Sequence, residues 1–420
     1  MNIDFHQAIE AAGVTASVFL IIFMIRKGWK MYYVMLAAVA VLALTGGSGA
    51  LEVADTFYRS LTSYTAFYLV SMVLAITILG SLHQEVGAMN RLVDGLRYLI
   101  RDPRALIMVF PAAISLFSTV PGGAIISAPM VEKTGKDLNM PPVELAMSNM
   151  VYRHLVVLIT PFNAGIILAS GISGISIGSY LSFTIPVIAI VFIIATVILL
   201  IRYPKPAKED WPVQKPSGSN SPLFDVFGSA APYAVAIILG LALGIFFPLA
   251  MLAGIVICFF LYLPEQHRGE TLRKRLKAIV RGFNWPLALS TLTIVLYKDF
   301  ILEADAFLDA VTLLVDRGLP LTVLIVVLPF ITGFITGNNA AALGVALPIL
   351  MPFLGSDMHS VRYFGIIYLS SYAGYFGSPV HLCTYVTNEY FKTPLYALIK
   401  GVNVYAIIML GVGLVLSLFY

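Results

Sequence analysis

The chain has 420 residues, of which 59% are hydrophobic and only 11% are charged, whereas a soluble domain has about 25% charged residues. This composition excludes a soluble protein, and the mean hydropathy of +0.90 agrees with that conclusion. The net charge of +4 comes from basic residues between apolar segments, which argues against binding to nucleic acid. The two cysteines, Cys258 and Cys383, lie in apolar segments, so we expect neither a disulfide framework nor a metal cluster. The sequence predicts an all-α polytopic membrane protein.

Apolar segments of membrane-spanning character recur along the chain from its N-terminus. The first, residues 12–26, has no basic leader and no small-residue cleavage site, so we expect a retained helix rather than a signal peptide. The pattern predicts ten membrane helices, at residues 12–26, 31–45, 61–80, 147–172, 177–202, 229–247, 249–263, 282–298, 362–387 and 394–419.

Four interruptions break the apolar pattern. Two further apolar segments, 104–130 and 321–353, are interrupted halfway by Ser-Thr-Val-Pro-Gly-Gly (118–123) and Thr-Gly-Asn-Asn (336–339), which predicts two re-entrant hairpins. Two of the predicted helices are themselves broken, at Thr-Pro-Phe-Asn-Ala-Gly (160–165) and at Gly-Ser-Pro-Val-His (377–381). Irregular backbone at membrane depth is tolerated only where protein or a water-filled cavity satisfies it, so these interruptions mark a functional region.

Basic residues determine the expected orientation. They gather after the first and third helices, after the first hairpin, in the linker 204–224 and in a predicted loop near 264–281. All of these positions fall on one side of the predicted arrangement. We therefore expect this side to be cytoplasmic and both termini to lie outside.

Prolines recur at a fixed spacing along the chain. The separation between Pro111 and Pro329 equals the separation between Pro161 and Pro379. This common separation, which we call the repeat length, predicts two repeats, residues 1–203 and 225–420, joined by the linker 204–224. Each repeat has five crossings, an odd number, so the second is inverted relative to the first. Inverted repeats with discontinuous helices are typical of secondary transporters.

Three motifs resemble a known family. PGGAIISAPMVE (121–132), YRHLVVLITPFNAGIIL (152–168) and GSPVHLCTYVTNEYF (377–391) are similar to an uncharacterised family of prokaryotic integral membrane proteins. That family belongs to the ion transporter superfamily, with gluconate, citrate, dicarboxylate and arsenite carriers as relatives. The resemblance implies an elevator-like fold, a homodimer and the prokaryotic inner membrane. The chain departs from the Ser-Asn-Thr signatures of the better-known carriers, which argues against a dicarboxylate substrate.

The four interruptions are expected to meet at one central cavity. Helix N-termini present partial positive charge there, and freed backbone carbonyls offer cation ligands. The candidate substrate- or ion-binding residues at or near the interruptions are Ser118, Thr119, Gly122, Gly123, Arg153, His154, Thr160, Asn163, Thr336, Gly337, Asn338, Asn339, Ser378 and His381.

The candidates have structural alternatives. Asn338 and Asn339 either bind a ligand or only cap the hairpin turn. Arg153 is either a counter-ion for an anionic substrate or a snorkelling side chain that pairs with Glu144. His381 is a donor to an anion, a proton carrier or a packed histidine.

No Asp or Glu falls inside any of the four interruptions. Amide and carbonyl oxygens suit a hard cation, so Na⁺ near Asn163, Asn338 and Asn339 is the expected coupling ion. Proton coupling through His381 or His154 is the alternative. No other cofactor is expected.

These features predict a secondary active transporter, a symporter that moves a small anionic organic solute by alternating access. Membrane lipids and the solute are the expected partners, and an enzyme is not expected. Gly-Gly-Ser-Gly (46–49) matches the short motif of intramembrane serine proteases, but no HExxH or P-loop is present. An intramembrane enzyme, a flippase for a polyprenyl-phosphate-like lipid carrier and a channel remain the alternatives.

Overall fold

The chain is helical throughout the residues that the structure describes, and no strand occurs among them. The computed structural model describes residues 5–117, 122–136, 138–204, 221–264, 267–304, 312, 318–354 and 360–419. Up to residue 204 the helices are α1 (Phe5–Arg26), α2 (Met31–Thr45), α3 (Ala50–Thr62), α4 (Tyr64–Glu85), α5 (Ala88–Leu99), α6 (Pro103–Phe117), α7 (Gly122–Lys136), α8 (Pro142–Leu158), α9 (Ala164–Ser173) and α10 (Ile177–Arg202).

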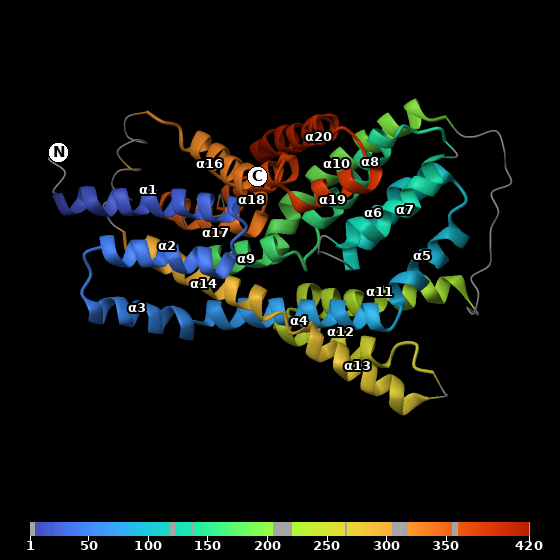
Figure 1. Cartoon of the computed structure of the whole chain (residues 1–420), viewed down its shortest axis with the longest axis horizontal. Helices are drawn as coiled ribbons and strands as arrows, with labels where there is room; N and C mark the ends of the chain where they lie inside the picture. The colour runs from blue at the N-terminus through green and yellow to red at the C-terminus, as the bar shows by residue number, and fades with distance from the viewer. Residues whose placement is uncertain are drawn as a thin grey trace.

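From residue 221 onward the helices follow a similar order (Figure 1). They are α11 (Pro222–Ile237), which a π-helical turn (Ile238–Ala242) extends, α12 (Phe247–Phe260), α13 (Arg268–Gly282), α14 (Trp285–Leu302), α16 (Leu321–Thr336), α17 (Asn339–Leu350), α18 (Ser360–Gly377), α19 (Leu382–Phe391) and α20 (Leu395–Leu416). Short 3₁₀ turns, Met351–Phe353 and Ser417–Phe419, follow α17 and α20.

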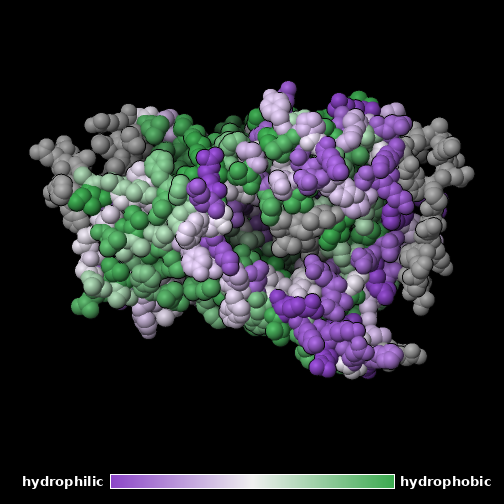
Figure 2. Space-filling view, in the orientation of Figure 1, coloured by the Kyte–Doolittle hydropathy of each residue, from purple (hydrophilic) through white to green (hydrophobic). Residues whose placement is uncertain are grey.

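Six helical segments of the described chain are long and apolar enough to cross a membrane. They are Ala8–Arg26, Tyr64–Glu85, Ile177–Arg202, Pro222–Ala242, Arg268–Leu302 and Leu395–Phe419. In α10 the outward face is apolar as well as the packed face, as the exposed side chains of Ile193 and Ile201 show, and lipid is the medium that favours such a face. Hydrophilic residues gather over α13, at the lower right of Figure 2. The chain is therefore a helical membrane protein.

Proline and glycine interrupt the helices where the sequence predicts it. α8 ends before Pro161 and α9 begins after it, while Pro379 lies between α18 and α19. Proline lacks the backbone N–H that a continuing helix needs. Gly337 ends α16 with φ of 58°, a left-handed conformation that glycine adopts without strain. Both predicted helix breaks and the turn of the second hairpin are confirmed.

Three helices, α3, α5 and α13, lie between the predicted membrane segments, where the sequence predicted none. The predicted loops after residue 46 and near residues 264–281 contain α3 and α13, in which ion pairs at a spacing of four residues join Asp55 to Arg59 and Glu270 to Lys274. Such pairs stabilise a solvated helix, but their charges lower the hydropathy on which the loop prediction depended. The helix predicted at 61–80 in fact spans α4, Tyr64–Glu85.

Helix bounds recur at a constant spacing, which equals the repeat length of the prolines. Both ends of α19 lie one repeat length after the corresponding ends of α9. The starts of α3 and α13, α6 and α16, α8 and α18, and α10 and α20 have the same separation. Equivalent helices take reciprocal neighbours: α2 packs on α14 as α4 packs on α12, α9 on α17 as α7 on α19, and α8 on α20 as α10 on α18. In Figure 1, α3 and α16 lie toward the left and α13 and α6 toward the right.

Candidate functional site

The second hairpin turn contacts both helix breaks. A Cβ atom on Gly337 would lie 2.9 Å from the carbonyl carbon of Val380, in the break between α18 and α19. A Cβ atom on Gly165, at the start of α9, would lie 2.2 Å from Nδ2 of Asn339. Two glycines therefore allow the turn to touch the chain on either side. Three of the four predicted interruptions meet.

The first hairpin turn cannot be placed against them. Ser118 and Thr119 lie outside the described residues. Gly122 and Gly123 form the first residues of α7, which packs on α19. The second helix of the first hairpin, α7, therefore packs against the helix that follows the second break.

The two adjacent amides of the second hairpin turn differ in role. Asn338 is exposed and caps α17, because its Oδ1 accepts a hydrogen bond of 3.0 Å from the backbone N–H of Ala341. Asn339 is buried, and its Oδ1 accepts a hydrogen bond from Oγ of Ser371. Its Nδ2 is buried without a hydrogen-bond partner among the described residues. Leaving a buried donor unpaired costs about 1–3 kcal/mol, which makes this amide a candidate ligand group.

The first helix break is closed by its own side chains. Oδ1 of Asn163 accepts a hydrogen bond of 2.6 Å from the N–H of Gly165, and its Nδ2 donates to the carbonyl of Val157 at 3.2 Å. Oγ1 of Thr160 donates to the carbonyl of Val156 at 2.8 Å. Asn163 is thus the N-cap of α9. The oxygens of Asn163, Asn338 and Asn339 all accept internal hydrogen bonds, so a bound Na⁺ would use their remaining lone pairs.

Hydroxyl groups tie the second helix break to the second hairpin. Oγ of Ser378 donates to the carbonyl of Phe334 in α16 at 2.6 Å and accepts from the N–H of Val380 at 3.2 Å. Oγ1 of Thr336 donates to the carbonyl of Thr332 at 2.6 Å within α16. These two hydroxyls fix the backbone of the turn and of the break.

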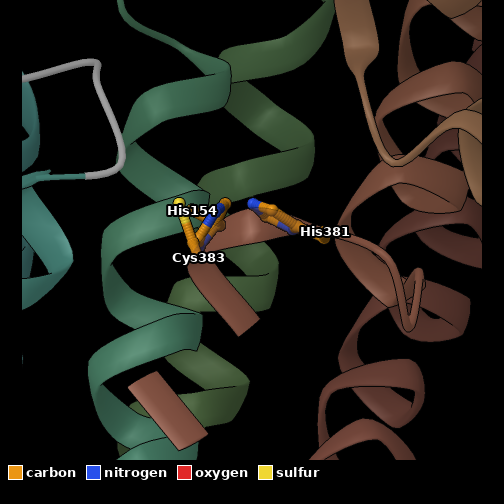
Figure 3. A group of neighbouring side chains, drawn as sticks. All are labelled: His154, His381 and Cys383. Carbon is orange, nitrogen blue, oxygen red and sulfur yellow. The ribbon is translucent and has the colours of Figure 1, made fainter. Parts of the chain in front are cut away.

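A buried polar cluster lies at the second break (Figure 3). The cluster consists of His154, His381 and Cys383, all buried. A ring nitrogen of each histidine and Sγ of the cysteine all lie within 4.8 Å of one another. The imidazole rings of His154 and His381 pack edge-to-face, with centroids 4.8 Å apart and planes at 86°. We define these three residues as the break cluster.

The two histidines differ in their hydrogen bonds. Nδ1 of His154 donates to the carbonyl of Met150 at 2.7 Å, so Nε2 of the neutral ring carries a lone pair. The backbone carbonyls of Tyr375 and Phe376 lie near the His381 ring. Neither ring nitrogen of His381, however, meets hydrogen-bond geometry with any described group. His381 therefore keeps its hydrogen-bonding capacity for a ligand.

Arg153 brings positive charge to the break cluster. Its side chain is 1% exposed, and its guanidinium lies close to the Cys383 thiol and to both histidines. The alternative in which Arg153 snorkels and pairs with Glu144 is wrong. The partners of that carboxylate are Arg202, at 3.0 Å, and the hydroxyl of Tyr203.

Sequence reasoning missed Cys383 as a member of this region. The sequence shows both cysteines only as members of apolar segments, and the structure brings Cys383 beside two histidines. The available signal was its position just after His381, in the first turn that follows the break. Its proximity to His154, which belongs to the other half of the chain, could not be seen from the sequence.

The two histidines and the cysteine of the break cluster are residue types that bind transition metals. Their surroundings, however, disfavour a bound metal ion. Zinc is bound at about 2.0–2.1 Å by histidine nitrogen and about 2.3 Å by thiolate. The three ligand atoms would have to close around the ion from separations of up to 4.8 Å. The buried guanidinium of Arg153 repels a cation in a medium of low dielectric constant. An anion suits the same place better.

A small cavity adjoins the hairpin turn. It has a volume of about 60 Å³ and is lined by residues that include Ala164, Asn338, Ala340 and Thr291. Such a volume accommodates waters, whereas pockets for organic ligands usually measure about 300–1,000 Å³. This cavity is therefore smaller than a usual pocket for an organic ligand.

Comparison with known proteins identifies the family. The chain matches one family over residues 11–419, described as "Protein of unknown function (DUF401)". A comparison with curated proteins finds no match. The family match includes both helix breaks, the second hairpin and Arg153. Because it covers nearly the whole chain, this protein belongs to the DUF401 family.

Proposed function

We propose that this protein is a secondary active transporter that moves a small anionic organic solute across the cytoplasmic membrane. The observation that carries the proposal is the contact of one hairpin turn with both helix breaks, through Gly337 at Val380 and Gly165 at Asn339. Interrupted helices at depth present backbone and amide groups that lipid cannot satisfy. Transporters use such groups to bind substrates and coupling ions.

Alternating access in this proposal depends on two inverted repeats, residues 1–203 and 225–420, with ten crossings, two hairpins and the linker 204–224. The constant spacing of helix bounds and the reciprocal packing of equivalent helices support it. The hydroxyl of Tyr372 donates a hydrogen bond of 2.7 Å to the carbonyl of His154, which lies one repeat length earlier in the chain. A residue that touches its own equivalent lies beside the axis relating the two copies. The break cluster would thus lie at the centre of the transporter.

The substrate's charge is inferred from the buried polar groups. Arg153 supplies a positive charge, while Asn339 and His381 supply hydrogen-bond donors. Buried ionisable residues inside a membrane protein mark substrate or ion pathways. Na⁺ or H⁺ would supply the driving force, in an elevator-like homodimer of the ion transporter superfamily in the inner membrane, with both termini outside.

Ligand screening followed by transport tests the proposal. Thermal unfolding of the purified protein would be measured with a panel of carboxylates, sugar acids, phosphates and sulfonates, with and without Na⁺. A compound that raises the melting temperature would then be tested for counterflow in proteoliposomes. We expect saturable uptake that a gradient of Na⁺ or H⁺ accelerates. Flux that rises linearly with solute concentration would indicate a channel, and accumulation of a chemically altered product would indicate an enzyme.

A further inference from the structure

The N-terminus of α19 is not capped by a side chain. His381 occupies its N-cap position and makes no capping hydrogen bond. At the equivalent position of α9, one repeat length earlier, Asn163 makes that bond. The first backbone N–H groups of a helix have no partner within the helix and carry partial positive charge. At α19 these donors remain for another acceptor.

Two buried side chains beside this helix end also lack partners. Both ring nitrogens of His381 and Oγ1 of Thr384 are without a hydrogen-bond partner among the residues described, and each side chain is 1% exposed. His381 points into the break cluster, toward His154 (Figure 3). Buried polar groups are normally hydrogen-bonded, so unpartnered groups at one place indicate a ligand.

The charge at this place selects the kind of ligand. Arg153 lies against Cys383, in the first turn of α19, and close to His381. A guanidinium, a helix N-terminus and uncharged N–H and O–H donors all favour an acceptor with negative charge. The same groups disfavour a cation bound by His154, His381 and Cys383.

We propose that the first turn of α19, together with His381, Thr384 and Arg153, binds a single oxyanion group. The group is a carboxylate or a phosphate, and it accepts hydrogen bonds from the backbone N–H groups, the imidazole, the hydroxyl and the guanidinium. The inference deepens the proposed function and rests on it only for identifying this group as the charged end of the transported solute. Binding itself requires no transport, so the two can fail separately.

His154 has a positioning role in this site. Its Nδ1 donates to Met150, so the Nε2 lone pair of its neutral ring cannot serve as an anion donor. Its ring packs edge-to-face on His381 and fixes the orientation of that imidazole, so that the single N–H of neutral His381 donates to the oxyanion.

Substitution of His381 by the residue at the equivalent position tests the site. In His381→Asn the amide oxygen should cap α19 as Asn163 caps α9, because asparagine is a preferred N-cap. The melting temperature of the purified full chain would be titrated with potassium acetate, potassium phosphate and potassium chloride at equal ionic strength. We expect a saturable rise with acetate or phosphate, none with chloride, and a dissociation constant at least tenfold higher in His381→Asn and severalfold higher in Thr384→Val.

The cysteines separate an oxyanion site from a metal site. Cys258→Ser, at a buried cysteine outside the break cluster, should keep the wild-type oxyanion response, whereas Cys383→Ser removes the thiol that a zinc ion would need. The inference is overturned if acetate and phosphate leave the wild-type melting temperature unchanged, or if His381→Asn responds as the wild type does. It is also overturned if zinc chloride alone stabilises the protein and Cys383→Ser abolishes that effect.

The same variants distinguish this inference from the proposed function. Oxyanion binding that depends on His381, in a protein without solute uptake, would contradict transport and support the site. Uptake that is equal in His381→Asn and wild type would support transport and contradict the site. Misfolding of His381→Asn would leave Thr384→Val, a nearly isosteric change, as the deciding variant.

Discussion

The two helix breaks have the same backbone plan and different chemistry. Each has a proline at the equivalent place, Pro161 or Pro379, followed by a helix of ten residues. Asn163 satisfies the first break internally, whereas His381 leaves the second without a side-chain cap. The two breaks therefore share a proline and a helix length but differ in capping: a side chain caps the helix after the first break, and none caps the helix after the second.

The second hairpin joins the two breaks and contacts them differently. At the first break, the side chain of Asn339 lies against Gly165. At the second break, the backbone of Gly337 lies against that of Val380. Any movement of this hairpin would therefore change the contacts at both breaks. Substitutions at these contacts test whether the two breaks differ as described.

The largest effect is expected at Arg153. Arg153→Gln keeps hydrogen-bond donors but removes the charge, so oxyanion affinity and uptake should fall about 100-fold, near 3 kcal/mol. Arg153→Lys should retain part of both, since it keeps the charge without the planar guanidinium. Affinity would come from thermal titration, and gel filtration would confirm folding. Wild-type affinity in Arg153→Gln would remove Arg153 from the second break's site.

The next largest effect is expected at Gly337. An alanine there needs a left-handed backbone, which costs about 1 kcal/mol, and its Cβ meets the Val380 backbone at 2.9 Å, which costs about 1–3 kcal/mol more. Gly174→Ala is the matched control: its φ is 73° and nothing lies within 4 Å of the added Cβ. Thermal unfolding should therefore show a larger loss for Gly337→Ala. Equal losses of stability in the two variants would mean that Gly337 is not in close contact with the Val380 backbone.

A double-mutant cycle tests the contact at the first break. Gly165→Ala places a Cβ 2.2 Å from Nδ2 of Asn339 and should displace that side chain from Ser371, at a cost of about 1–2 kcal/mol. Asn339→Ala removes the obstructing amide. The double variant should be more stable than the sum of the two single losses predicts. Strict additivity would show that the two residues do not touch.

The smallest effect is expected at Asn338. Asn338→Asp keeps the capping oxygen at the N-terminus of α17, so the free energy of unfolding should change by less than about 0.5 kcal/mol. Asn339→Asp instead places a carboxylate at a buried position and should lower both stability and uptake. Thermal unfolding and uptake would be compared for the two variants. The reverse ranking would contradict the division of roles between the two amides.

Local patterns in the sequence were sufficient for the positions of the interruptions. Proline, glycine and the repeat spacing predicted the breaks around Pro161 and Pro379 and the turn at Gly337, because these residues act on the backbone where they stand. The amphipathic helices α3, α5 and α13 were missed because hydropathy alone does not separate a charged helix from a loop. Helical spacing of ion pairs such as Asp55–Arg59 was the signal that could have found α3.

The candidate site was predictable only in part. Sequence could indicate that Asn339 and His381 lie at interruptions, but it assigned the two adjacent amides Asn338 and Asn339 the same role. Their difference arises from the helix phase of α17, which exposes one and buries the other. The association of Cys383 and Arg153 with His154 and His381 depends on the packing of α8 against α19, which no local pattern specifies.

Alternating access requires the two hairpins to change their exposure in opposite directions. Gly122 and Ala340 lie one repeat length apart, at the starts of α7 and α17. Each would be replaced singly by cysteine in a Cys258→Ser, Cys383→Ser background and labelled in vesicles with an impermeant maleimide, before and after addition of the stabilising solute and Na⁺. We predict that one labelling rate rises as the other falls. Rates that rise or fall together at both positions would contradict alternating access and indicate a continuous pore.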